Sequence, residues 1–170
     1  MLYHLVFAVK PKHAIVIEPT FEEYNRALAL VGCKIHHHTV KAENHFILDR
    51  DVLSAIQADC DMMFLCNPNN PTGQLVSPQL LQDIIKCCYD KNVLLVVDEC
   101  FIEFLPVWEK YTLKNLAALS ENMIVIDAFT KTYSLAGFRL GFCVSGNINL
   151  LSSMHLYGQD FSVSTPVQFA

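Results

Sequence analysis

The chain has 170 residues, with 12 Lys and Arg against 17 Asp and Glu, so that its formal net charge is −5 at neutral pH. Charged residues make up 17% and hydrophobic residues 52% of the chain, which excludes a disordered protein because such chains lack the apolar surface that offsets ordering entropy. The acidic balance argues against a nucleic-acid groove, no apolar run approaches the roughly 18 residues of a membrane span, and the length suits one domain.

The first part of the chain alternates between two hydrophobic periods. Short β-rich runs have the continuous or alternating pattern of strands, and the segments between them have helical spacing. Gly32 has the position of a helix stop. The elements predicted here, in chain order, are the second half of a helix at 2–10, a strand at 13–18, a helix at 21–32, a strand at 34–40, a helix at 50–58 and a strand at 61–66.

The second part of the chain repeats the alternation. Ser77 has the position of an N-cap before a segment whose apolar side chains fall on one helical face. The remaining predicted elements are a helix at 78–92, strands at 93–99, 122–128 and 139–146, and a helix at 148–157. The last strand is close enough to its predecessor to return antiparallel, whereas the continuous apolar runs are typical of parallel strands covered on both faces. The pattern therefore predicts an α/β layered fold.

The cysteines and a run of three histidines indicate no metal site. The chain has seven cysteines but no C-x-x-C pair, and Cys87 and Cys88 are adjacent, so we interpret them as reduced thiols of a cytoplasmic protein. The histidines at 36–38 alternate between the two faces of a predicted strand, and no set of Cys, His or carboxylate ligands follows at a suitable spacing.

Chemically distinctive residues follow four of the predicted strands. The segment 19–21 follows the first strand, 67–73 follows the third, Asp98 ends the fourth, and 127–142 follows the fifth. In open α/β sheets ligands bind beyond the carboxyl ends of the strands. These segments are therefore expected to form one site, with Lys131 in the loop after the strand 122–128.

Three of these segments carry a resemblance to a known family. NPNNPTG (67–73), VVDECFIEF (96–104) and TKTYSLAGFRLGF (130–142) resemble, in this order and spacing, the aminotransferase class I/II family of pyridoxal-phosphate enzymes of fold type I. The resemblance covers essentially the whole chain and is nearest to the branch of threonine-phosphate decarboxylases and histidinol-phosphate aminotransferases. It implies a three-layer αβα fold with a mostly parallel sheet and one antiparallel strand, with residues 1–170 as part of the cofactor-binding large domain.

The resemblance assigns roles around pyridoxal 5'-phosphate to six residues. Lys131 would form the imine with the cofactor aldehyde and is the implied catalytic residue. Asp98 would pair with the pyridine N–H and keep it protonated, so that the ring can accept electrons from the substrate. The remaining implied contacts are Asn70 with the phenolic oxygen, Arg139 and Thr130 with the phosphate, and Phe21 stacked on the ring.

Each of these residues also has an ordinary structural interpretation when it is taken alone. Lysines are usually solvated, an Asp after an apolar strand is often a cap or turn residue, and Asn-Pro-Thr-Gly is an ordinary turn. Arg139 could pair with Asp127, and Phe21 could belong to the core. The shared order and spacing of the motifs favours the cofactor interpretation.

The chain departs from the family pattern in three ways. Phe101 stands where the family usually has a tyrosine that contacts the phenolic oxygen, and a phenylalanine at this position is common in the decarboxylase branch. Ala128 replaces a phosphate-binding serine. The family also has a glycine-rich phosphate turn and a small domain with a carboxylate-binding arginine, expected before Met1 and after Ala170. The chain is therefore interpreted as a fragment of an enzyme that is a homodimer in its full-length form.

These observations leave three functions open. The first is threonine-phosphate decarboxylase, which would make an aminopropanol phosphate for cobalamin biosynthesis. The second is histidinol-phosphate aminotransferase or a related enzyme, so that in both cases the partner is a small amino-acid phosphate. The third is a truncated, non-catalytic remnant that binds cofactor or dimerises through exposed apolar surface. A dinucleotide-binding domain is excluded because no G-x-G-x-x-G follows the first strand.

Overall fold

One six-stranded sheet organises the chain in the computed structural model, which describes residues 1–159 and 163–168. The strands lie in the order β2-β1-β3-β4-β5-β6, in which β1 to β5 are parallel and β6 is antiparallel to β5. Their bounds are β1 His13–Glu18, β2 Lys34–Thr39, β3 Met62–Cys66, β4 Leu94–Asp98, β5 Met123–Ala128 and β6 Gly141–Val144. This arrangement confirms the predicted mostly parallel sheet and its antiparallel strand.

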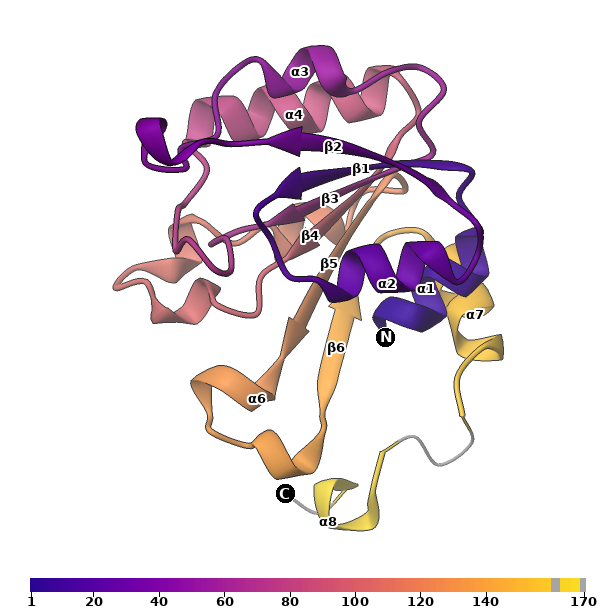
Figure 1. Cartoon of the computed structure of the whole chain (residues 1–170). Helices are drawn as coiled ribbons and strands as arrows, with labels where there is room; N and C mark the ends of the chain where they lie inside the picture. The colour runs from indigo at the N-terminus through magenta and orange to yellow at the C-terminus, as the bar shows by residue number, and fades with distance from the viewer. Residues whose placement is uncertain (160–162, 169–170) are drawn as a thin grey trace.

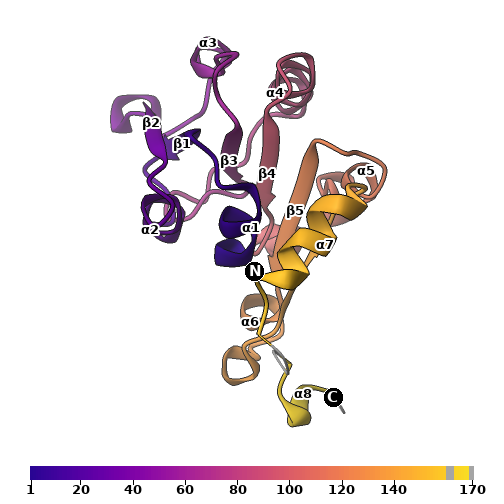
Figure 2. The same cartoon turned by 90° about the vertical axis from the view of Figure 1, so that its right-hand side faces the viewer.

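Helices cover both faces of the sheet, which confirms the three-layer αβα fold. Figure 1 shows α3 and α4 on one face and α1 and α2 on the other, and both views place α7 beside α1 (Figure 2). The α-helices are α1 Leu2–Val9, α2 Glu23–Ala29, α3 Val52–Ala55, α4 Pro78–Asp90, α5 Lys114–Ala117, α6 Phe129–Thr132, α7 Ile148–Leu156 and α8 Thr165–Gln168. Short 3₁₀ turns are η1 Ala42–Asn44, η2 Ile102–Phe104, η3 Trp108–Lys110 and η4 Ala136–Phe138.

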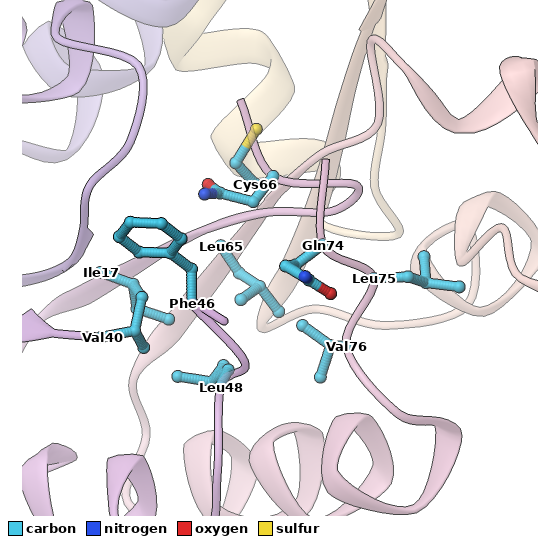
Figure 3. A pocket seen from close by; sticks show the side chains of 10 residues that line it. Ile17, Val40, Phe46, Leu48, Leu65, Cys66, Gln74, Leu75 and Val76 are labelled. Carbon is cyan, nitrogen blue, oxygen red and sulfur yellow. The ribbon is translucent and has the colours of Figure 1, made fainter. Parts of the chain in front are cut away.

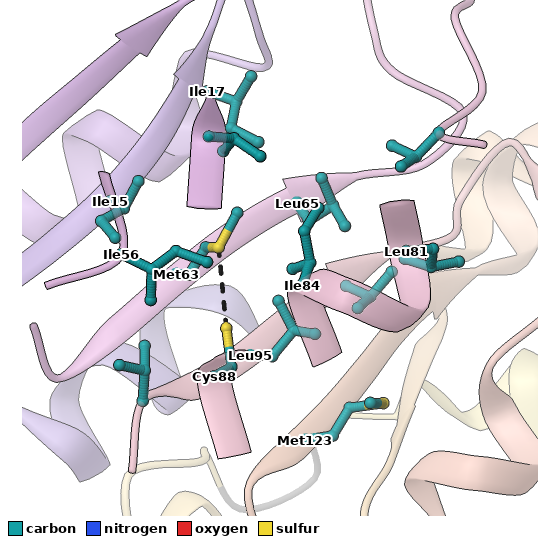
Figure 4. Packing of buried hydrophobic residues seen from close by; sticks show 14 of the residues in the cluster. Ile15, Ile17, Ile56, Met63, Leu65, Leu81, Ile84, Cys88, Leu95 and Met123 are labelled. Carbon is teal, nitrogen blue, oxygen red and sulfur yellow. Dashed lines mark hydrogen bonds between the residues drawn. The ribbon is translucent and has the colours of Figure 1, made fainter. Parts of the chain in front are cut away.

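The larger of two apolar clusters lies between the sheet and the layer of α3, α4 and α5. Ile84 of α4 is fully buried and packs with Met63 of β3 and Leu95 of β4 (Figure 4). The Cys88 thiol of the same helix lies 3.9 Å from the sulfur of Met63. Ser77 begins α4 as expected, because its hydroxyl accepts a hydrogen bond from the Leu80 amide.

The second cluster lies on the opposite face, under α1, α2 and α7. Leu5 of α1, Leu28 of α2 and Met154 of α7 cover alternate side chains of the central strands. Since the central strands are buried on both faces, their sequences are continuous apolar runs, and this is the pattern from which they were predicted.

Several predicted helices are shorter in the structure. The helix expected over 21–32 spans Glu23–Ala29, and Gly32 lies three residues beyond its end with a φ of +69°, a left-handed conformation that favours glycine. The helix expected over 50–58 is a single turn, Val52–Ala55, because Ile56 takes an extended backbone and buries its side chain completely. The 3₁₀ turns and α5, α6 and α8 were not predicted.

The connections reverse direction beside β1. The chain leaves β1 for β2 on one side and returns to β3 on the other, which makes the boundary between β1 and β3 a topological switch point. The loops that carry Phe21 and Asn70 follow these two strands. Ligand sites of open α/β sheets form in such a crevice, at the carboxyl ends of the strands.

Two observations concern the described residues as a whole. Within 1–159 and 163–168, none of the helices has both the length and the apolar character needed to cross a membrane. All seven cysteines lie in this part of the chain and are free thiols.

The packing of α4 gives a stability prediction. We expect Ile84→Ala to lower the free energy of unfolding by about 2–5 kcal/mol, because the substitution removes a fully buried side chain and leaves a cavity. Gln82→Ala, at an exposed position of the same helix, is the matched control and should change it by about 0.5 kcal/mol or less. Chemical denaturation of the two variants measures the difference, and equal losses would contradict this packing.

Candidate functional site

The carboxyl ends of the central strands border a pocket of about 250 Å³ that is partly open to solvent. All six predicted site residues lie in its lining, which consists of Phe21, Cys66, Asn70, Asp98, Cys100, Phe101, Ala128, Thr130, Lys131 and Arg139. The structure therefore brings together residues that are spread over more than a hundred positions of the sequence.

Asp98 is the buried anionic group of the pocket. It ends β4 opposite Cys66 of β3, and only 8% of its surface is exposed. One carboxylate oxygen, Oδ2, accepts a hydrogen bond of 2.6 Å from the Tyr24 hydroxyl, and the other, Oδ1, accepts one of 3.0 Å from the Cys100 amide. A donor on each oxygen fixes the plane of the carboxylate and offsets part of its desolvation.

Tyr24 is a site residue that the sequence analysis missed. Its ring is buried on α2 and stacks on Phe64, with the ring centres 4.9 Å apart and an interplanar angle of 12°. Burial, reinforced by the negative charge of Asp98, raises the pKa of Tyr24 well above its usual range. The hydroxyl thus stays protonated and donates to Asp98. The available sequence signal was its position three residues after Phe21, whose ring it meets edge to face with the ring centres 5.7 Å apart.

The loop that carries Asn70 is joined to the loop after β1. Asn69 donates from Nδ2 to the Pro19 carbonyl at 2.9 Å and to the Thr72 hydroxyl at 2.9 Å. The Asn70 amide lies 3.4 Å from the Cys66 sulfur. Gly73 closes the turn with a φ of +71°. These contacts fix Asn70 and the Phe21 loop relative to one another on either side of the switch point.

Lys131 and Thr130 lie on α6, a single helical turn that directly follows β5. The prediction that Lys131 lies in a loop was wrong in this respect, although the residue does lie at the end of the strand. Figure 1 shows β5 and β6 carrying α6 beyond the other strands. Lys131 is exposed, and its ammonium lies 5.4 Å from the centre of the Phe101 ring, within the range of a cation–π contact.

Arg139 is exposed and directly follows η4, at the other end of the segment that connects β5 to β6. Its φ is +52°, which is uncommon for a residue other than glycine. The suggested pairing of Arg139 with Asp127 is wrong, because the cation paired with Asp127 is Lys114, at 2.6 Å. The guanidinium donates to the Ala136 carbonyl at 3.4 Å and lines the pocket.

Two thiols of the pocket lining were not predicted. Burial, with a contribution from Asp98, raises the pKa of Cys66 to about 12, and the same causes raise the pKa of Cys100. A thiol must lose its proton to act as a nucleophile or metal ligand. We therefore assign Cys66 and Cys100 to the apolar lining. Within the described ranges, no three His, Cys, Asp or Glu side chains converge in a metal-binding arrangement.

A smaller cavity lies behind the loop 66–76 and is mostly apolar. Ile17, Phe46 and Leu65 point into it (Figure 3), and Cys66 is the residue that it shares with the site pocket. Because its walls carry few polar groups, this cavity is part of the packing of the loop.

The charges of the pocket suit a flat aromatic ligand with two different ends. Asp98 offers a buried carboxylate to a protonated ring nitrogen, while Thr130, Lys131 and Arg139 place a hydroxyl and two cations near solvent for an anionic substituent. Phe21, which is 43% exposed, adds an aromatic ring to the lining of the pocket. The donor set of the pocket therefore fits a phosphorylated pyridine ring.

Comparison with protein families gives one match along the chain. The family model described as aminotransferase class I and II matches residues 1–170. Threonine-phosphate decarboxylase of Salmonella typhimurium is 34% identical over 165 residues, which are 96% of this chain and 44% of that protein. Histidinol-phosphate aminotransferase 1 of Bacillus cereus is 30% identical over 166 residues, which are 92% of this chain and 41% of that protein. The chain thus spans less than half the length of these relatives.

Solved structures share the fold. Aspartate aminotransferase of Thermus thermophilus in the presence of maleate superposes with a TM-score of 0.83 at 21% identity, over 95% of this chain and 43% of that one. L-threonine-O-3-phosphate decarboxylase from Porphyromonas gingivalis superposes with a TM-score of 0.80 at 19% identity, over 96% of this chain and 46% of that one.

The contact between Tyr24 and Asp98 gives a second stability prediction. We expect Tyr24→Phe to lower the free energy of unfolding by about 1.5–3 kcal/mol, because a buried carboxylate loses a charge-assisted hydrogen bond. Tyr89→Phe is the matched control, since the Tyr89 side chain is 72% exposed. Denaturation of both variants at neutral pH gives the difference. If the two variants were equally stable, water would have to replace the Tyr24 hydroxyl at Asp98.

Proposed function

The chain belongs to the aminotransferase class I and II family, and we propose that it forms the cofactor-binding large domain of an enzyme that uses pyridoxal 5'-phosphate to act on a phosphorylated amino acid. The observation that carries this proposal is the single pocket that gathers Lys131, Asp98, Asn70, Arg139, Thr130 and Phe21. Their charges and burial match the ends of such a cofactor.

Each pocket residue has a distinct role in this proposal. Asp98, held by Tyr24, accepts a hydrogen bond from the ring nitrogen and keeps its proton in place. Arg139 and Thr130 bind the phosphate, Asn70 donates to the phenolic oxygen, and Phe21 covers one face of the ring.

The reactive group of the protein is the Lys131 amine. When bound, pyridoxal phosphate supplies an electron sink for the α-carbon of the substrate. Lys131 would hold the cofactor through its amine nitrogen and would move a proton to or from the α-carbon of the substrate. Its position on the exposed turn α6, at the mouth of the pocket, leaves the amine within reach of a bound ligand.

Threonine-phosphate decarboxylase is the function that we propose for the whole protein. Two observations favour it over other activities of the family. Phe101 occupies a position where the resemblance associates a phenylalanine with the decarboxylases, and its ring lies under the Lys131 ammonium. The relative of that name from Salmonella typhimurium is 34% identical. The product would be an aminopropanol phosphate for cobalamin biosynthesis.

Histidinol-phosphate aminotransferase is the second candidate, because relatives with this name reach 30% identity over 92% of the chain. Both candidates act on a small phosphorylated substrate, and in both we expect a cytoplasmic homodimer in the full-length form. A non-catalytic remnant that binds cofactor or dimerises is the candidate of a different class.

The role of Lys131 can be tested on the chain itself. We expect a protein mixed with pyridoxal phosphate and then reduced with borohydride to carry the label on Lys131, as located by peptide mass spectrometry. Lys131→Ala should lose this label and change the free energy of unfolding by about 0.5 kcal/mol or less, because the side chain is exposed. Lys41→Ala, which removes another exposed lysine, should keep it. Label scattered over surface lysines of the unaltered chain would count against the cofactor site.

The substrate is tested by following two products. We expect the full-length protein to release CO₂ from L-threonine phosphate in the presence of pyridoxal phosphate, and Lys131→Ala to abolish the release. Transfer of an amino group from histidinol phosphate, with no CO₂ from threonine phosphate, would assign the second candidate. Neither reaction, with Lys131 still labelled, would favour the non-catalytic remnant.

A further inference from the structure

A buried charge cluster lies behind the site, on the face of the sheet opposite the pocket. Its cation is Lys114 of α5, whose ammonium lies 2.6 Å from Asp127 Oδ2 and 3.7 Å from Glu103 Oε1. Only 17% of the Lys114 side chain and 7% of the Asp127 side chain are exposed. The rings of Trp108 and Phe142 also face the ammonium, with their centres at 5.3 and 5.4 Å.

Asp127 connects this cluster to the segment that carries the reactive lysine. Its second oxygen, Oδ1, accepts a hydrogen bond of 2.6 Å from the Ala128 amide. Ala128 is the N-cap residue of α6, and α6 has no side-chain cap of its own. The carboxylate of Asp127 therefore joins Lys114 on one side to the junction of β5 and α6 on the other, directly before Thr130 and Lys131.

Glu99 fixes the position of Lys114 from the neighbouring strand end. Glu99 is fully buried directly after Asp98. Its oxygens accept hydrogen bonds of 2.6 Å from the Thr112 hydroxyl and 2.7 Å from the Leu113 amide. These two residues lead directly into α5, so the place of the ammonium is set by β4 as well as by its own helix.

The charges of the cluster are unbalanced. Among the described residues, the carboxylates of Asp127 and Glu103 pair with Lys114, and the negative charge of Glu99 also acts on it. Burial raises the pKa of Glu99 and of Asp127, and the charge of Lys114 opposes this in both. Burial also acts to lower the pKa of Lys114, but its contact with Asp127 outweighs this, so that the pKa of the lysine is raised. Without Lys114, Asp127 would be a buried carboxylate with no cation beside it.

We propose that Lys114 is a positioning residue, which holds the β5–α6 junction through Asp127 and so presents Thr130 and Lys131 to the pocket. The importance of this role for catalysis rests on the function proposed for Lys131. The holding of the junction is a property of the protein without cofactor and is tested separately.

The first experiment measures hydrogen exchange of the Ala128 amide in the cofactor-free chain. We expect Lys114→Met to speed this exchange about tenfold or more relative to the amides of α4, which report global opening, because an unpaired buried carboxylate is costly. Lys114→Arg should restore slow exchange. The double variant Lys114→Met/Asp127→Asn should be closer to the unaltered chain than Lys114→Met, since it removes the stranded charge. Lys110→Met removes an exposed lysine and is the control.

The pH dependence separates the charge of Lys114 from its packing. In Lys114→Met the Asp127 pKa in the folded state is raised further above its unfolded value. A raised pKa gives stability that is present below the unfolded value of about 4 and is lost as the pH rises through the folded value. The excess exchange of Lys114→Met should therefore grow as the pH rises above about 4. A constant excess across this range would overturn the proposal, as would Ala128 exchange that rises no more than that of α4.

The second experiment connects the cluster to Lys131. We expect Lys114→Met to slow the borohydride-trapped labelling of Lys131 by pyridoxal phosphate about tenfold relative to the unaltered chain, and Lys114→Arg to restore it. Faster Ala128 exchange with unchanged labelling would overturn the presentation of Lys131 by this cluster. If the unaltered chain were not labelled at Lys131, the proposed function would fail, and the exchange data alone would decide whether Lys114 holds the junction.

Discussion

The structure depends on the parallel direction of β1 to β5, which places the carboxyl ends of these strands at one edge of the sheet. Parallel strands need helical crossovers, and the crossovers bury the sheet on both faces. The helices leave the carboxyl ends of the strands and the loops that follow them accessible. Polar groups can therefore collect there without disturbing the apolar layers, and the pocket forms where the strand order reverses beside β1.

The alternation of side chains at these strand ends gives two polar networks instead of one. Asp98 faces the pocket and is held by Tyr24, whereas Glu99, the next residue, faces the other layer and contacts Thr112. At the end of β5 the same alternation directs Ala128 to the pocket and Asp127 to Lys114. A buried carboxylate must be paired or hydrogen-bonded to remain ionised, so each network satisfies groups that the other face cannot reach.

The sequence was sufficient to predict the sheet and its antiparallel strand, because apolar runs are local patterns, and the family resemblance of its motifs predicted six of the residues that line the pocket. It was insufficient for the contacts that fix these residues. Tyr24 and Asp98 are 74 positions apart, and no periodic pattern connects them. Asp127 was weighed as a partner of Arg139, yet α5, which was not predicted, brings Lys114 to it. The length of α3 was overestimated, because the backbone at Ile56 is extended and its side chain is buried in the core.

In the proposed function the charged groups of the pocket bind the cofactor, and other groups select the reaction. Among the described residues that line the pocket, the cations are Lys131 and Arg139. In the proposed function Arg139 would bind the cofactor phosphate and the Lys131 amine would be bonded to the cofactor aldehyde, so both would be engaged before a substrate with its own carboxylate and phosphate arrives. Decarboxylation and transamination differ in which bond of the substrate α-carbon breaks, and in the proposed function the groups that bind the substrate carboxylate would set that choice. In the proposed function the strand ends described here would thus determine the class of chemistry, while the groups that bind the substrate carboxylate would determine which bond breaks.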